Sequence, residues 1–65
     1  MPPFFLTVFN NVFDAKQRYL ELYNSGALCL YEKGIYDAMY KIIKELNLEA
    51  EFKSYEEMRL EAKRK

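Results

Sequence analysis

Apolar residues recur at helical spacing in three parts of the chain, which predicts helices over about residues 11–25, 30–46 and 54–64. Asn11 can cap the first helix, and Gly26 supplies the left-handed backbone position at which helices often end. Asn47 is expected to end the second helix, and Ser54 with Glu57 matches a capping box before the third. We therefore expect a mainly α fold, a small three-helix domain.

The residues before the first helix have the features of a strand. Phe4–Phe9 is rich in aromatic and β-branched residues, follows Pro2-Pro3 and stops at Asn10-Asn11. The pattern predicts an N-terminal strand, or an extended arm whose Phe residues cover the helical core.

Two further segments fit either a helix or a strand. Ala27–Glu32 contains a short apolar run, and Leu48–Lys53 alternates apolar with charged residues. Because the capping box places the start of the last helix at Tyr55, Leu48–Lys53 is expected to be extended. The alternative architecture is an α+β domain in which Phe4–Phe9, Ala27–Glu32 and Leu48–Lys53 form a small sheet covered by the helices.

The second helix carries two apolar stripes rather than one. The longer stripe is predicted to face the core and consists of Leu28, Tyr31, Ile35, Ala38, Met39, Ile42 and Leu46. Tyr36, Tyr40 and Ile43 lie on a neighbouring face, displaced by about 100° at 3.6 residues per turn. Either this second stripe binds a partner, or the helix is central and packs on both sides.

The composition strengthens the case for an interaction surface. The chain is expected to form one domain over residues 1–65, and a chain of this size buries only about 60% of its unfolded surface. Five Phe and six Tyr are more aromatic surface than such a core easily hides. Phe and Tyr are favoured at protein interfaces because they bury a large area at little cost in rotamer entropy.

Catalytic and metal chemistry finds little support in the composition. The chain has no His, so its one thiol, Cys29, has no imidazole nearby to generate a thiolate. A structural zinc site would need about four Cys or His ligands. The carboxylates of Glu49, Glu51, Glu56 and Glu57 lie among lysines and are expected on solvated helix faces. We expect no enzymatic activity, no cofactor and no metal.

A basic C-terminal helix end is the alternative site. Lys and Arg gather there beside an aromatic ring, and the candidate nucleic-acid contacts are Tyr55, Arg59, Lys63, Arg64 and Lys65. Glu56, Glu57 and Glu61 in the same helix cancel much of this charge, and the net charge of the chain is zero. Nucleic acid is therefore expected less than a protein as the partner.

The apolar run near Met1 is too short to span a membrane, and it lacks the basic start of a signal peptide. Cys29 has no disulfide partner in the chain, which fits a reducing compartment. A cytoplasmic location is expected. The Lys, Asn and Tyr content is typical of AT-rich genomes, where short chains of phages and mobile elements are frequent.

The function expected from these patterns is non-catalytic protein binding, as a small regulator, inhibitor or assembly subunit. The expected partner is another protein or a second copy of the chain in a homodimer. The residues predicted to bind it are Tyr36, Tyr40, Ile43 and Phe13.

Overall fold

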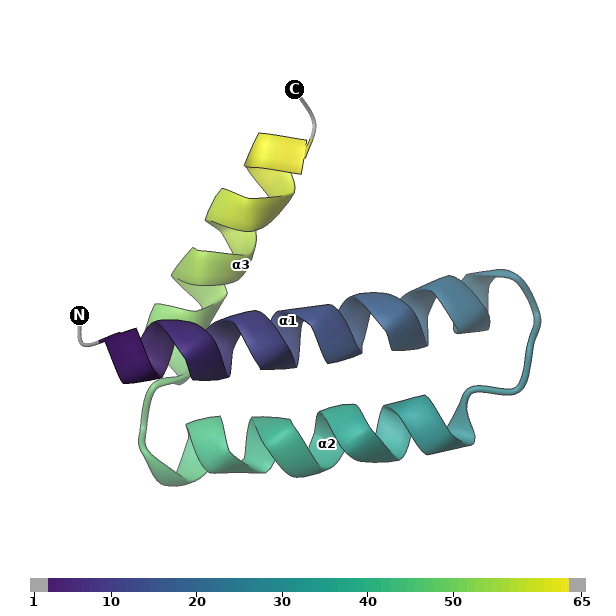
Figure 1. The fold of residues 1–65 in the computed structure, drawn as a ribbon, viewed down its shortest axis with the longest axis horizontal. Helices are drawn as coiled ribbons and strands as arrows, with labels where there is room; N and C mark the ends of the chain where they lie inside the picture. The colour runs from purple at the N-terminus through teal and green to yellow at the C-terminus, as the bar shows by residue number, and fades with distance from the viewer. Residues whose placement is uncertain (1–2, 64–65) are drawn as a thin grey trace.

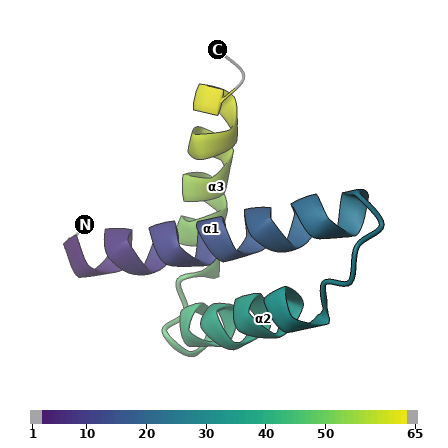
Figure 2. The same cartoon turned by 45° about the vertical axis from the view of Figure 1, so that its right-hand side comes forward.

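The structure, a computed structural model, describes residues 3–63 and folds them into three helices. α1 spans Pro3–Asn24, α2 spans Leu30–Glu45 and α3 spans Glu49–Lys63. α1 and α2 lie side by side in antiparallel directions, and α3 crosses α1 and leaves the pair at a steep angle (Figure 1, Figure 2). The predicted three-helix architecture is confirmed. The described residues contain no strand, so the α+β alternative is not adopted.

The predicted strand or arm at Phe4–Phe9 is wrong, because the backbone of these residues belongs to α1. The helix continues through Asn10 and Asn11 without interruption, so Asn11 does not cap it. Helical spacing brings Phe9, Val12 and Phe13 to the same side of α1, where all three are buried. The tertiary contacts of that side outweigh the strand preference of the local sequence. The side chain of Phe4 lies outside the described part.

The same backbone motif closes the first two helices. After α1, Gly26 has a φ of 79°, and the N–H of Ala27 donates to the carbonyl of Leu22 at 3.0 Å. After α2, Asn47 has a φ of 57°, and the next N–H donates to the carbonyl of Ile43 at 3.0 Å. Both are Schellman motifs, in which a left-handed residue lets the chain leave the helix while the last carbonyls stay bonded. The predicted helix ends at Gly26 and Asn47 are confirmed.

α3 begins at Glu49, so the prediction that Leu48–Lys53 is extended is wrong. The N–H of Phe52 donates to the carbonyl of Leu48 at 2.9 Å, which is the first hydrogen bond of this helix. Ser54 therefore lies inside the helix and caps nothing. Acidic residues in the first turn suit the positive end of the helix dipole. The earlier start places Phe52 where it can enter the core.

The core lies where the three helices meet. Its fully buried members are Phe9, Val12, Phe13, Ile43 and Phe52. Half-buried side chains packed against them are Val8, Tyr36, Met39, Tyr40, Leu48 and Tyr55. Six of these eleven side chains are aromatic, and rings of this size bury a large area each.

The stripe of α2 that was predicted to face the core faces solvent instead. Tyr31, Ile42 and Leu46 are exposed, and of this stripe only Met39 packs against the core. The core side of α2 is formed by Tyr36, Tyr40 and Ile43, the residues assigned to the second stripe. The reason is complementary packing, since Tyr36 stacks on Tyr19 of α1 and Tyr40 meets the edge of Phe52 of α3.

Gly34 lies inside α2, where a methyl group should stabilise the helix. A Cβ at this position would meet no atom within 4 Å. We expect Gly34→Ala to raise the free energy of unfolding by about 0.5–1 kcal/mol, because Gly loses more backbone entropy on folding than Ala. Urea unfolding at low protein concentration measures this. The control is Gly26→Ala, which should destabilise the chain because the φ of 79° strains a residue with a side chain. A loss of stability in Gly34→Ala would contradict the prediction.

Candidate functional site

One face of α2 exposes a continuous row of apolar side chains. We call it the outer face of α2 and define it as Tyr31, Ile35, Ala38, Ile42 and Leu46. The exposed fractions are 76% for Tyr31, 48% for Ile42 and 45% for Leu46. Ala38 is also exposed, and Ile35 is half-buried. Leu28, in the connection before α2, and Leu30, its first residue, add further exposed apolar surface near Tyr31.

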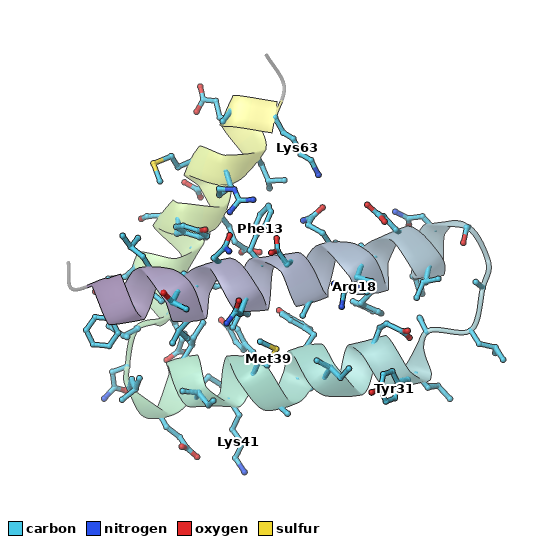
Figure 3. All side chains as sticks on the ribbon, viewed as in Figure 1. Phe13, Arg18, Tyr31, Met39, Lys41 and Lys63 are labelled. Atoms are coloured by element: carbon cyan, nitrogen blue, oxygen red, sulfur yellow. The ribbon has the colours of Figure 1, made fainter. Side chains whose placement is uncertain are left out.

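The regular geometry of α2 holds these five side chains together. At 100° per residue they fall within an arc of about 80°, along a helix about 24 Å long. Figure 3 shows the side chain of Met39 directed toward α1 and that of Lys41 directed away from it. At 100° per residue Met39 lies only about 20° from Leu46, so it marks the border between the outer face and the core side of the same helix. Contiguous exposed apolar surface of this kind is a common mark of an interaction site.

A row of alternating charge runs beside the outer face. Its members, spaced by four residues along α2, are Lys33, Asp37, Lys41 and Glu45. Lys33 and Asp37 form an ion pair with 3.1 Å between Nζ and Oδ2, and both side chains remain about half exposed, at 50% and 55%. Lys41 and Glu45 are exposed as well. At 100° per residue, Glu45 and Lys41 lie within about 60° of Ala38, and the row turns away from the outer face toward Lys33, about 140° from Ala38.

The four residues predicted to bind a partner are brought together, but in the core. Phe13 and Ile43 are buried, and Tyr36 and Tyr40 are half-buried against them. The rings of Tyr36 and Tyr40 lie 5.8 Å apart, and that of Tyr36 stacks on Tyr19 at 6.3 Å. This placement is a correction to the predicted surface: these side chains hold α2 against α1 and α3. It matches the other interpretation of the second stripe, in which it packs within the chain.

An ion pair between α1 and α3 lies at the edge of the core, next to Tyr36. Lys16 of α1 donates to Glu56 of α3 at 2.7 Å, and both side chains are partly buried. Burial lowers the pKa of the Lys16 ammonium, but the hydrogen bond and the negative charge of Glu56 outweigh it and hold the pKa above its ordinary value of 10.5. Burial raises the pKa of the Tyr36 hydroxyl above 10.0, an effect that the nearby Lys16 opposes.

We expect the free energy of unfolding to fall as the pH rises above about 10, because Lys16 and Tyr36 both hold their proton more tightly in the folded chain. Each of the two groups contributes its full stabilisation at pH values below its pKa in the unfolded chain. That stabilisation is lost as the pH rises through the higher pKa that the group has in the folded chain. Tyr36→Phe removes one of the two groups, so its stability should fall less steeply. Urea unfolding between pH 8 and about 11 tests this. Tyr23→Phe is the control, since Tyr23 is 63% exposed; equal slopes for wild type and Tyr36→Phe would contradict the prediction.

The residues proposed for nucleic-acid contact lie along α3, and two of them are bound to α1. Arg59 donates to Asn10 at 2.6 Å and to the hydroxyl of Tyr55 at 2.7 Å, and its guanidinium lies 4.5 Å from the centre of the Phe13 ring. Asp14 adds a longer ion pair at 3.9 Å. These contacts join α1 to α3 and leave Tyr55 and Arg59 little freedom to stack a base or bind a phosphate.

Of the remaining candidates for nucleic-acid contact, Lys63 is exposed at the end of α3 (Figure 3), and Arg64 and Lys65 lie outside the described residues. Nucleic-acid binding therefore stays a prediction, without a described cluster of free cations to support it.

Cys29 lies half-buried at the N-terminal cap of α2, and its side chain makes no capping hydrogen bond. The nearby Lys33 ammonium is bonded to Asp37. Within residues 3–63, no group of three or more His, Cys, Asp or Glu residues could hold a metal ion. In the same part of the chain, no helix combines the length and the apolar character needed to cross a bilayer.

The outer face of α2, with its neighbouring charged row, is thus the candidate site that the described residues offer. No protein-family model, curated protein or solved structure matches this chain.

Proposed function

We propose that this protein is a non-catalytic protein-binding module, acting as a small regulator, inhibitor or assembly subunit, and that it binds through the outer face of α2. The observation that carries the proposal is the exposure of the apolar side chains Tyr31, Ala38, Ile42 and Leu46 along α2 and its C-cap. The cytoplasm is the location we propose, since its reducing conditions suit a lone Cys29.

The distribution of residues on α2 supports a second contact for this helix. A helix with one apolar stripe and one polar face is typical of the surface of a domain, whereas a helix that is apolar on two sides is usually buried on two sides. The Tyr36, Tyr40 and Ile43 side of α2 is covered by α1 and α3. The outer face has the same apolar character but no helix of the described chain over it. A protein surface is the cover that fits an aliphatic and aromatic helix face.

The side chains themselves suit a protein interface. Tyr31 offers a ring with a polar tip, and Ile42 and Leu46 offer branched aliphatic groups on a rigid helix. Such groups lose little conformational freedom when they are covered. The core residues contribute indirectly, because Phe13, Tyr36 and Tyr40 hold α2 in place and keep the outer face preformed.

Site-specific photo-crosslinking tests the proposal. A photoreactive amino acid at Ala38, in the middle of the outer face, should yield a covalent adduct with a protein in the cells that produce this chain. The matched control carries the same amino acid at Lys53, an exposed position on α3. Crosslinking from Ala38 and not from Lys53 supports the proposal. Absence of any protein adduct from Ala38, with the variant folded, contradicts it.

A further inference from the structure

We propose that the partner of the outer face of α2 is the outer face of a second copy of this chain, with the two α2 helices antiparallel around a two-fold axis level with positions 39 and 40 along the helix. This inference rests on the proposed function, because it names the molecule that covers the same surface. Two neighbouring rows of residues on α2 carry it, one through the size of its side chains and the other through their charge.

The first row is complementary to itself in size. Along α2 it runs through Gly34, Ala38, Ile42 and Leu46, which are all exposed. The small residues occupy its first half and the large residues its second half. In an antiparallel pair centred between Ala38 and Ile42, each Ile42 would face Ala38 of the other copy, and each Leu46 would face Gly34. Rows at this four-residue spacing are the ridges that fit into grooves when two helices pack.

The open space at Gly34 agrees with this arrangement. A Cβ there would meet no atom of the same chain within 4 Å, so the helix surface is bare at that point. Gly inside a helix costs about 1 kcal/mol relative to Ala, and nothing within the described chain requires it at this position. In the proposed pair, the absence of a side chain at Gly34 leaves room for Leu46 of the other copy. Two helices approach most closely where their side chains are smallest.

The second row is complementary to itself in charge. Each of its members directly precedes a member of the first row, so the two rows lie side by side on α2. The order along the helix is Lys33, Asp37, Lys41, Glu45. An antiparallel pair centred at position 39 places Asp37 opposite Lys41 of the other copy, along one edge of the contact. A parallel pair would instead place each charge opposite an identical one. The charges thus favour the same orientation, around nearly the same point, as the side-chain sizes.

The available area suits a dimer of modest affinity. The described chain exposes 4963 Å², and the smallest stable interfaces bury about 600 Å² on each partner, roughly an eighth of that surface. One helix face about 24 Å long and about 10–12 Å wide has a footprint of roughly 240–290 Å², which is below this lower limit. We therefore expect an equilibrium between monomer and dimer rather than a permanent assembly.

Sedimentation equilibrium of the purified chain gives the first test. The average mass should rise from that of the monomer toward twice that value between about 1 µM and 1 mM. Ile42→Asp should remain a monomer throughout this range, while its helical circular dichroism shows that it is folded. A wild-type chain that stays monomeric at about 1 mM overturns the inference. A dimer that Ile42→Asp does not weaken overturns it too.

Exchanging charges tests the orientation of the two helices. Lys41→Glu alone and Asp37→Lys alone each place like charges opposite one another, and each should weaken self-association about tenfold. An equimolar mixture of the two variants should restore association, because each Glu at position 41 then faces a Lys at position 37. Failure of the mixture to associate better than either variant alone would exclude the antiparallel pair.

The crosslink from Ala38 separates this inference from the proposed function. An adduct with the mass of two copies supports both. An adduct with a different protein, together with a monomer in sedimentation, overturns the inference and leaves the proposed function standing. No adduct at all contradicts the proposed function itself.

Discussion

Phe52→Ala should leave the chain largely unfolded at 25 °C. Phe52 is the buried residue of α3, and its ring lies 5.5 Å from that of Phe9, 5.8 Å from Tyr40 and 6.3 Å from Tyr55. It therefore joins all three helices at one point. Replacing a buried Phe by Ala costs about 3–5 kcal/mol, and a core in a domain of this size usually supplies only about 3–5 kcal/mol in total. The loss should consume nearly all of the stability.

Circular dichroism and urea unfolding of Phe52→Ala measure the loss. The control is Met58→Ala on the same helix, whose side chain is 61% exposed. It should change the free energy of unfolding by no more than about 0.5 kcal/mol. If Phe52→Ala instead unfolds cooperatively with nearly wild-type stability, α3 is not anchored through this ring.

The helix ends show which parts of the fold are readable from local sequence. Gly26 and Asn47 were predicted to end helices and do so, because a left-handed residue is a requirement of the backbone at that position itself. Ser54 carries an equally good local signal, the capping box, yet lies within α3. The burial of Phe52 requires the earlier start, and that contact depends on residues of α1 and α2 that are distant in sequence.

In the N-terminal segment, too, a contact with residues distant in sequence decides the local structure. Strand propensity in Phe4–Phe9 is a weak preference, and packing of Phe9 against Phe52 decides the matter in favour of a helix. The contact between Arg59 and Asn10 joins residues that are 49 positions apart. No spacing rule within a helix could indicate it, so a cation that looks free in the sequence proves to be part of the packing between α1 and α3.

The candidate surface was visible in the sequence, but its role was not. Both apolar stripes of α2 can be read from their spacing, and the longer one has six large side chains against three on the other. Which stripe turns inward depends on what the other helices present. α1 and α3 offer the rings of Tyr19 and Phe52, and these match Tyr36 and Tyr40. The stripe without such partners is left outside and becomes the candidate site.

The sharpest test of that assignment uses two neighbouring residues of the same type. We expect Ile43→Asp to unfold the chain and Ile42→Asp to leave it folded, because Ile43 is 0% exposed and Ile42 is 48% exposed. At position 43 the change removes buried contacts worth about 2–5 kcal/mol, and it also places a carboxyl group among the apolar side chains of the core. At position 42 the carboxylate remains in water, so the cost is limited to the weaker helix propensity of Asp, about 0.7 kcal/mol or less.

Urea unfolding of both variants at low micromolar protein concentration isolates the stability of the monomer. The fold described here requires a large difference in the free energy of unfolding between the two variants, in the order given. The opposite order would restore the stripe of Tyr31, Ile42 and Leu46 to the core and would remove the candidate surface. Repeating the measurement at high concentration adds a second readout, because a dimer stabilises the folded chain by mass action. The wild-type chain should then gain stability as the concentration rises, and Ile42→Asp should not.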